Sequence, residues 1–428
     1  MIMSQHLNES PRCLSESSIR LLKSTSATLS TEGTKVTSRM YEIMLSNYPI
    51  VKNLFNTSHI HMNGGSNAVS PQAQALANAV FRFAANADNL TALQDMLKLI
   101  AHKHVSFNIL PEHYPIVGNC LLRAIKDVLQ DAVTDEVMEA WREGYDYLAD
   151  LFIEMENDIK EQNKMKGGWV GFKPLIVSEK IKETEDITSF ILKAPNGEDL
   201  PDFLSGQYIS IRIPNGKIEK VEHDIVRNYS LSSMCCRKFF KISIKKEVSS
   251  KLLSPDGIAS AYFHNIVNVG NEVLVGNPCG TFFLKKDLSS HILISAGVGL
   301  TPMISMIETL LSTNDNYNQI LFIHCAKSEA HFAMKQHVEE LCKNTRLTTH
   351  VFYSKEHEVK ELESKIITHN NHLTKEVLES IVSVPSNHNY YICGPSRFLH
   401  FVKGALEEMN VSAEKINYEY FGPTQEYL

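Results

Sequence analysis

Three patterns of apolar and polar positions follow one another along the chain. From about residue 14 to 160, apolar residues recur with helical spacing. From about 170 to 285, apolar and polar residues alternate, with turns such as PNG between the runs. From about 288 onward, short apolar strands such as HILISAG and NYYICGP alternate with helical stretches. We therefore predict a multidomain chain, with an all-α domain, an antiparallel β domain and a parallel α/β domain.

The stretch AHKHVSFNIL places two histidines in one predicted helix. A helix advances about 100° per residue, so Leu97 and His104 fall within about 40° of Leu93, whereas His102 falls near 180°. His104 is thus predicted to face the apolar stripe and His102 the solvent. A histidine on an apolar face is most often an ordinary core residue. It also suits a haem iron, which needs one imidazole and an apolar pocket.

Two polar side chains lie beside apolar stripes on other predicted helices. Gln72 begins the stripe of PQAQALANAVFRF that continues with Leu76, and is either half-solvated or a donor to an iron-bound gas. Glu156 lies at the edge of a later apolar face, whereas Glu154 points the other way. A carboxylate there costs free energy unless it is paired. It is either a snorkelling surface residue or the acceptor for the ring N–H of a ligating histidine.

The β region carries SGQYIS and RNYSL, which suit a flavin site. Side chains alternate along a strand, so Arg227 and Tyr229 project to one side, a cation for phosphate beside an aromatic wall. Alone, Tyr208 and Tyr229 could equally be ordinary strand aromatics. Downstream, DGIASAYFHN is a candidate helix start whose backbone amides would receive a pyrophosphate.

The α/β region opens with a glycine loop, ISAGVGLTPM, between a predicted strand and helix. Gly297 and Gly299 would let the backbone approach a phosphate, with Thr301 as helix N-cap and Pro302 in the first turn. The helix N-terminus would then attract the pyrophosphate. The spacing is not that of the G-x-G-x-x-G fingerprint, and a plain turn is the simpler alternative.

Together these motifs resemble the flavohaemoglobins, over about residues 14–428 and in that family's domain order. KHVSFNILPEHYPIVG resembles the family's proximal haem segment, VKNLFNTS its haem-contacting corner, and RNYS with G-x-G-x-T-P its ferredoxin-reductase-like module. The resemblance implies an all-α globin domain, an antiparallel β-barrel FAD-binding domain and a parallel-sheet α/β NAD(P)-binding domain. The expected boundaries are an N-terminal extension 1–13, globin 14–160, linker 161–170, FAD-binding 171–286 and NAD(P)-binding 287–428.

The resemblance also implies roles for individual residues. His104 would be the proximal iron ligand, Tyr114 and Glu156 a charge relay behind it, and Tyr41 and Gln72 the gas-binding side. Further haem contacts would come from Phe55, Leu76 and Lys103. FAD would be held by Tyr208, Arg227, Asn228, Tyr229 and Ser230. The nicotinamide dinucleotide would be held by Gly297, Val298, Gly299, Leu300, Thr301 and Pro302. Phe421 would cover the flavin ring, and Tyr420, Gly422 and Pro423 of the same motif would also contact the cofactor.

Two of these positions depart from the family pattern. Leu300 stands where glutamine is common, and Tyr420 where cysteine is common. Backbone contacts to a nucleotide survive the first change, whereas a side-chain contact does not.

The implied cofactors are haem b, FAD and NAD(P)H, because a flavin converts two-electron hydride donation into one-electron transfer to iron. The implied activity is nitric oxide dioxygenase, which forms nitrate from NO and O₂. One alternative is a globin that binds or senses oxygen and is kept ferrous by its reductase. Another is a flavin reductase whose helical domain binds no haem.

The composition of the chain argues against some classes of binding partner. The 428 residues carry a net charge of −7 with no basic block, which argues against nucleic acid and anionic membranes. No apolar run approaches the roughly 20 residues that span a bilayer, and no secretory signal is visible. The eight cysteines form no C-x-x-C pair and suit a reducing compartment. We expect a cytoplasmic monomer that binds NO and O₂ and can hold a lipid in its haem pocket.

Overall fold

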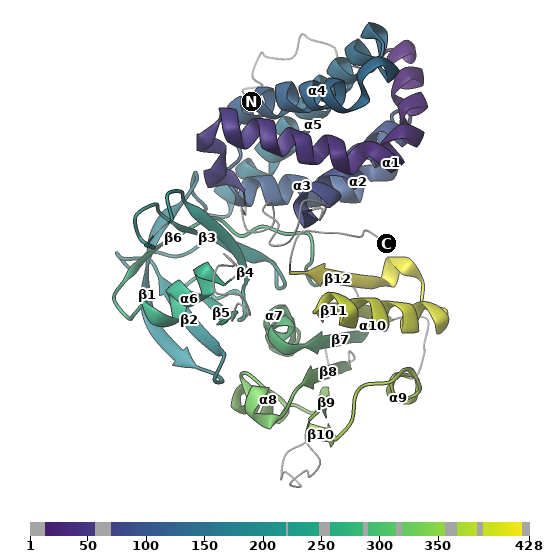
Figure 1. Cartoon of the computed structure of the whole chain (residues 1–428). Coiled ribbons are helices and arrows are strands. Elements are labelled where there is room, and N and C mark those ends of the chain that lie inside the picture. The colour runs from purple at the N-terminus through teal and green to yellow at the C-terminus, as the bar shows by residue number, and fades with distance from the viewer. Residues whose placement is uncertain are drawn as a thin grey trace, which may run out of the picture. The chain divides into compact units, whose positions relative to one another are not determined.

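The computed structural model separates into two compact units, the first ending at Glu161 and the second beginning at Gln162. Figure 1 shows helices alone in the first unit and two different sheets in the second. The residues that the structure describes are 13–55, 70–219, 221–247, 257–285, 290–313, 319–355, 366–382 and 388–421.

The first unit is built from long helices. The α-helices are α1 (Glu16–Asn47), α2 (Pro71–Ala85), α3 (Gln94–Ser106), α4 (Tyr114–Leu129) and α5 (Asp135–Met165). The 3₁₀ turns are η1 (Pro49–Leu54), η3 (Leu90–Leu93), η4 (Pro111–His113) and η5 (Gln130–Ala132). Helix α1 packs on α2 and α4 around a core that includes Leu22, Met40 and Met44.

Local chemistry sets where these helices begin and how closely they cross. Ser70 caps α2 by accepting a hydrogen bond from the Ala73 N–H, and Pro71 occupies the first turn. On α4, a Cβ at Gly118 would lie 2.4 Å from the Tyr145 ring of α5. Only a glycine allows that crossing.

The first sheet of the second unit, built from residues 173–275, is antiparallel, as predicted. Its strands are β1 (Lys173–Lys182), β2 (Ile187–Lys193), β3 (Tyr208–Ile213), β4 (Ile225–Ser230), β5 (Phe240–Lys245) and β6 (Glu272–Val275), with helix α6 (Ile258–Asn265) between the last two. Within the described residues their order is β4-β3-β6-β1-β2-β5. A bridge between Leu231 and Ile242 joins the two ends, so the sheet closes into a barrel.

The other sheet is parallel throughout, also as predicted. Its strands are β7 (Ser290–Ala296), β8 (Ile320–Ala326), β9 (Leu347–Tyr353), β10 (Ile366–His369), β11 (His388–Gly394) and β12 (Ile416–Tyr420). Its helices are α7 (Leu300–Ser312), α8 (Lys335–Leu341), α9 (Lys375–Ile381) and α10 (Ser396–Glu408). Its 3₁₀ turns are η6 (Gly297–Gly299), η7 (Glu329–His331) and η8 (Ala413–Lys415).

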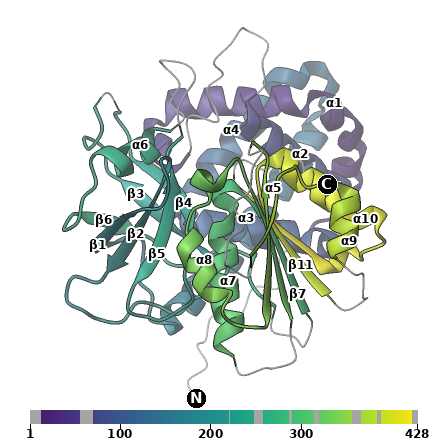
Figure 2. The ribbon, with the colours of Figure 1, turned by 90° about the horizontal axis from the view of Figure 1, so that it is seen from below.

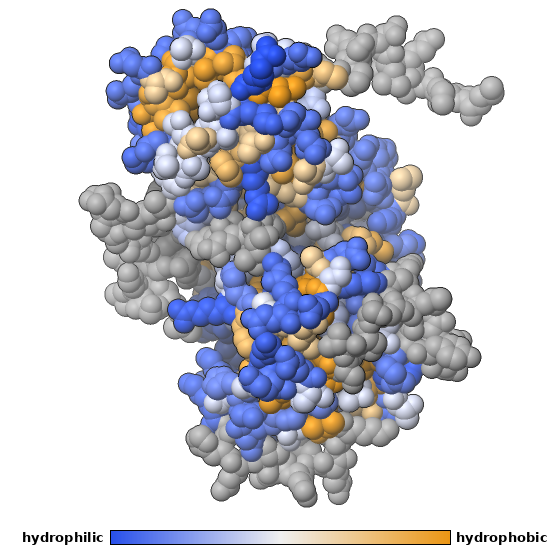
Figure 3. All heavy atoms as spheres, turned by 90° about the vertical axis from the view of Figure 1, so that its right-hand side faces the viewer, coloured by the Kyte–Doolittle hydropathy of each residue, from blue (hydrophilic) through white to orange (hydrophobic). Residues whose placement is uncertain are grey.

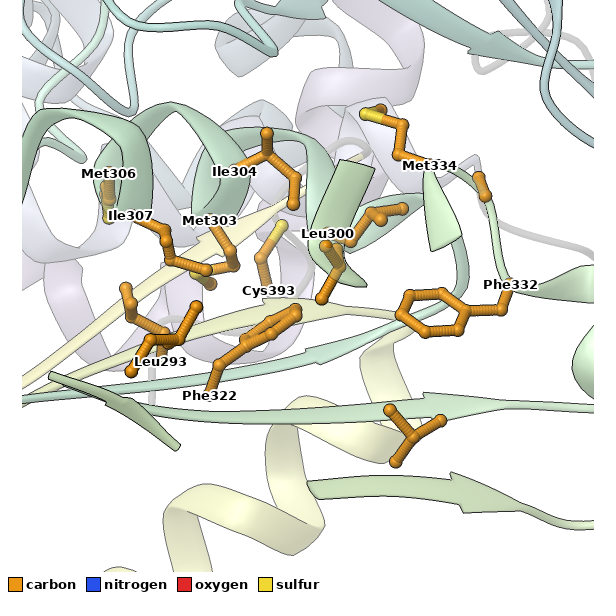
Figure 4. Packing of buried hydrophobic residues seen from close by; sticks show 14 of the residues in the cluster. Leu293, Leu300, Met303, Ile304, Met306, Ile307, Phe322, Phe332, Met334 and Cys393 are labelled. Atoms are coloured by element: carbon orange, nitrogen blue, oxygen red, sulfur yellow. The ribbon is translucent and has the colours of Figure 1, made fainter. Parts of the chain in front are cut away.

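The strand order is β10-β9-β8-β7-β11-β12. Successive strands are added on one side of β7 up to β10, and β11 and β12 are then added on its other side. Ligands bind in the crevice that forms where the order switches in this way. Helices cover both faces of the sheet: Figure 2 shows α7 and α8 on one face and α9 and α10 on the other. An apolar core lies on each face, between the helices and the strands. Figure 4 shows the first core, where Leu300, Met303 and Ile304 of α7 pack over Phe322 and Cys393.

The surface is mixed in character. Figure 3 shows one face on which hydrophilic residues predominate and apolar side chains are interspersed. Among the helices in the described ranges, none has the length and apolar character that crossing a bilayer requires.

Candidate functional site

His104, in the last turn of α3, meets two polar side chains from other helices. Its Nδ1 lies 2.9 Å from Oε1 of Glu156 and 3.0 Å from the Tyr114 hydroxyl, and that hydroxyl also donates to Glu156. Glu156 is fully buried, whereas the His104 side chain is 32% exposed to solvent. These contacts hold a proton on Nδ1 and leave Nε2 as the ring nitrogen for a metal.

The turn after α3 brings these side chains together. Asn108 adopts a left-handed backbone, with φ of 55°, and Ile109 N–H returns to the His104 carbonyl at 2.9 Å. The chain then starts α4 at Tyr114. The Tyr145 hydroxyl of α5 donates to the Tyr114 carbonyl at 2.7 Å, which joins α4 to α5. A tyrosine on an apolar face needs a partner for its hydroxyl, and that was the only sequence signal for Tyr145.

Within this cluster, burial keeps the Tyr114 hydroxyl protonated. Burial, and then the hydrogen bond to Glu156, raise the pKa of Tyr114 above its ordinary value, so the tyrosine stays a donor. The second carboxylate oxygen of Glu156 has no hydrogen bond within the described part of the chain, and Lys160 Nζ lies 4.0 Å from it. The contacts from His104 and Tyr114 thus both end on Oε1 of Glu156, and Lys160 faces the other oxygen.

A second polar pair forms between α1 and α2. Tyr41 is buried and hydrogen-bonded to the Gln72 side chain; burial raises the pKa of Tyr41 and this hydrogen bond lowers it. The Phe55 ring stands edge-on to Tyr41, with centroids 5.6 Å apart. The structure thus brings Tyr41 and Gln72, both expected on the gas-binding side, together with Phe55, an expected haem contact, and Tyr41 is a neutral hydroxyl.

The helices that carry these residues leave apolar surface for a cofactor. On α2, Ala73 and Ala77 are buried, whereas Gln72 and Leu76 on the neighbouring stripe stay half-exposed. Further half-exposed apolar side chains are Val80, Met96, Ile100 and Val105. A flat macrocycle would cover such side chains, and His104 Nε2 is its available ligand, so these residues fit a haem.

One neighbour of His104 is less exposed than the sequence predicted. His102 is half-buried rather than fully exposed. Lys103, a further expected haem contact, is half-buried as well.

The flavin motif lies on paired strands. In the β3–β4 register Tyr208 faces Ser230, Ser210 faces Asn228 and Ile211 faces Arg227. Alternation places Arg227 and Tyr229 on one side of β4, and both are half-buried. A half-exposed guanidinium beside an aromatic ring fits a flavin with its phosphate.

Two contacts support the flavin-side aromatics. The Tyr229 ring stands edge-on to Phe263 of α6 at 5.8 Å, and burial raises the pKa of Tyr229 to about 12. Gly280 has φ of 115°, and a Cβ there would lie 2.9 Å from the Tyr208 ring. Helix α6 starts after Gly257, which has φ of 88°, and its first amides are those expected to receive a pyrophosphate.

The glycine loop differs from expectation at Thr301. Strand β7 runs through the 3₁₀ turn 297–299 directly into α7, whose N-cap is Gly299. The N-cap assignment of Thr301 is therefore wrong; its hydroxyl donates a hydrogen bond to the Val298 carbonyl at 3.0 Å instead. Pro302 lies in the first turn, as predicted.

The two glycines of this loop serve different purposes. Gly297 has φ of 55° with open space at its Cβ position, which suits close approach of a phosphate. At Gly299, a Cβ would lie 2.3 Å from the Cys393 carbonyl oxygen, so this glycine is required by packing. Leu300 is fully buried in the core, which leaves only its backbone for a nucleotide.

The C-terminal aromatics follow the last strand. Tyr420 pairs with Gly394 across β12 and β11, and Phe421 beyond it is 44% exposed. An exposed phenylalanine at a strand end fits a cover for a flat ring. Gly422 and Pro423 lie outside the described residues.

Comparisons with known proteins identify three domains along the chain. Family models match as Globin, Oxidoreductase FAD-binding domain and Oxidoreductase NAD-binding domain, over residues 38–152, 174–284 and 293–404. The chain is 38% identical over 415 residues to a Flavohemoprotein of Bacillus subtilis, covering 96% of this chain and 98% of the relative. A Flavohemoprotein of Bacillus thuringiensis is 40% identical over 413 residues, with the same coverage.

Two solved structures are also similar. The flavohemoglobin of Malassezia yamatoensis, which contains FAD and haem, matches with a TM-score of 0.79 at 22% identity, covering 96% of this chain and 100% of that one. The FAD/NAD-binding domain of a Vibrio cholerae nitric oxide dioxygenase matches with a TM-score of 0.51 at 29% identity, covering 59% of this chain and 99% of that one.

The expected architecture and cofactors are thereby confirmed: a globin domain for haem, followed by FAD- and NAD-binding reductase domains. Such a chain is an NAD(P)H-driven haem and flavin oxidoreductase. It belongs to the flavohaemoprotein family.

Proposed function

We propose that this chain is a nitric oxide dioxygenase, which converts NO and O₂ to nitrate with electrons from NAD(P)H. The observation that carries the proposal is the cluster of His104, Tyr114 and Glu156. A carboxylate on the ring N–H of a histidine raises its basicity as a ligand. A protein that only stores oxygen has no need of that electron donation, nor of a fused reductase for sustained turnover.

The proposed proximal role belongs to three side chains. Glu156 accepts the Nδ1–H of His104, and Tyr114 holds the carboxylate in place by donating to the same oxygen. The ring is thereby fixed in the tautomer whose Nε2 is a ligand. When bound, haem and flavin supply the redox chemistry, the flavin accepting a two-electron hydride and releasing single electrons.

The proposed distal role belongs to Tyr41 and Gln72. The raised pKa of Tyr41 keeps its hydroxyl protonated, and its link to Gln72 orients that hydroxyl. A hydroxyl held in this way would stabilise negative charge on a small molecule bound beside it. Phe55, edge-on to Tyr41, together with Leu76 provides an apolar wall.

The proposed reductase roles follow from the strands and the glycine loop. Arg227 would bind the flavin phosphate, with Tyr208, Asn228, Tyr229 and Ser230 along the ring. The backbone from Gly297 to Pro302 would bind the dinucleotide pyrophosphate. Phe421 would cover the flavin and yield to the nicotinamide.

The test is rapid mixing of the reduced, oxygenated protein with NO while nitrate and NADH are followed. Fast nitrate formation coupled to NADH consumption is expected. Oxygenated protein that persists in NO, or NADH use that is indifferent to NO, would instead favour an oxygen-binding or sensing globin. Absence of a Soret band would indicate a flavin reductase without haem.

A further inference from the structure

Two shielded carboxylates link the flavin barrel to the nicotinamide-binding domain inside the second compact unit. Glu183, in the turn between β1 and β2, accepts a hydrogen bond from the Met334 backbone N–H at 3.1 Å. Glu308, on α7, accepts one from the Met234 backbone N–H at 2.6 Å. Their side chains are 11% and 16% exposed. Each domain thus presents a carboxylate to a backbone donor of the other.

On the barrel side, Glu183 is held by two further groups. The Ser189 hydroxyl donates to its Oε1 at 2.6 Å, and Lys241 Nζ lies 3.6 Å from the same oxygen. Oε2 is left for Met334, which has a left-handed backbone with φ of 55°. A residue other than glycine rarely adopts that conformation, so an external partner helps to hold it.

On the nicotinamide side, Glu308 belongs to a row of polar groups on α7. The Ser305 hydroxyl donates to the Ser233 carbonyl at 2.7 Å, and the Thr309 hydroxyl lies 2.6 Å from that of Ser205. His337 of α8 contacts Glu308 through Nε2 at 2.6 Å. This row fixes α7 against the segments that flank the flavin strands.

Each carboxylate contacts a segment next to an expected cofactor site: the glycine loop after β7 or the RNYS motif. Met334 lies two residues after Phe332, whose ring stacks on that of His324 with centroids 4.9 Å apart. His324 Nδ1 in turn lies 2.9 Å from the hydroxyl of Ser295, near the end of β7. Figure 4 shows Phe332 and Met334 near Leu300, where α7 begins after the glycine loop. On the flavin side, 231–234 directly follows the RNYS motif.

We propose that Glu183 and Glu308 are positioning residues that hold the nicotinamide-binding domain in register with the flavin barrel for hydride transfer. Two hydrogen bonds that run in opposite directions and end at separate points restrain rotation more than one contact would. Misplacement of reacting groups by about 1 Å can cost roughly 10²-fold in rate. The proposal rests on the FAD- and NAD-binding architecture and not on nitric oxide chemistry.

The first measurement is hydrogen exchange by mass spectrometry on the full-length protein. Glu183→Ala should speed exchange in residues 328–338, and Glu308→Ala in 231–239, each by about tenfold or more, because a hydrogen bond to a charged group is lost. The glutamine variants should show intermediate effects, since an amide oxygen still accepts. Glu185→Ala, at an exposed position in the same turn as Glu183, should leave exchange unchanged.

The second measurement is anaerobic flavin reduction over a range of NADH concentrations, with FAD content checked by absorbance. The limiting rate should fall by roughly ten- to a hundredfold in each alanine variant, with little change in the NADH dissociation constant. Faster exchange with a wild-type limiting rate would overturn the positioning role, as would unchanged exchange or an equal effect in Glu185→Ala. Flavin reduction needs no NO, so this outcome is independent of the dioxygenase test.

Discussion

Replacing Glu156 with glutamine tests the proposed proximal cluster most directly. The substitution keeps the shape and one acceptor oxygen but removes the negative charge 2.9 Å from His104 Nδ1. Tyr114 retains a partner, so the helices should stay in place. What changes is the electron donation of the His104 ring.

The magnitude follows from the burial of the carboxylate. Altering a carboxylate that orients a ligating histidine typically costs 10–100-fold in metal affinity or activity, or about 1.4–2.7 kcal/mol. Glu156 is fully buried, so solvent and salt do little to screen its charge. We therefore expect NO consumption to slow by about 10–100-fold at saturating NADH.

The assay is NADH-dependent NO consumption at an electrode, with haem content and thermal unfolding measured on the same samples. Glu154→Gln is the matched control, because Glu154 is exposed on the same helix two residues away. A wild-type rate in the Glu156 variant would refute the reasoning. An equal loss in both variants would show that the effect is not specific to the cluster.

Three further predictions concern other parts of the chain. His104→Ala should abolish haem retention, measured by the Soret band, whereas His102→Ala should not; loss in the second variant alone would refute the assignment. Tyr41→Phe should slow NO consumption by about tenfold through loss of one donor, and an unchanged rate would argue against its distal role. Gly299→Ala places a Cβ 2.3 Å from the Cys393 carbonyl oxygen, so the free energy of unfolding should fall by about 1–3 kcal/mol. A denaturant titration measures this change, and an unchanged free energy would contradict the packing argument.

Some of the candidate site could be read from spacing alone. The phase of the helix pointed His104 toward the apolar stripe, where it meets Tyr114 and Glu156, because side chains repeat every 3.6 residues; the expected full exposure of His102 was wrong. Strand alternation likewise put Arg227 and Tyr229 on one side of β4. Periodicity and turn residues also predicted the three kinds of domain, since each kind of element buries its apolar side chains with its own period.

Other features depend on which segments meet in space. The N-cap of α7 was misassigned to Thr301, because the sequence does not show that a 3₁₀ turn continues the strand into the helix. The need for glycine at position 299 comes from the Cys393 carbonyl, almost a hundred residues away.

The sequence by itself determined the order and type of the domains and the chemistry they could carry, because periodicity and motif spacing are local properties. Only the tertiary structure decided that Glu156 reaches the ring of His104, and that Glu183 and Glu308 each reach a backbone N–H of the other domain. A glutamate at a helix edge or in a turn looks the same in sequence whether it is solvated or paired. Its role is set by the burial and the donors that folding brings to it.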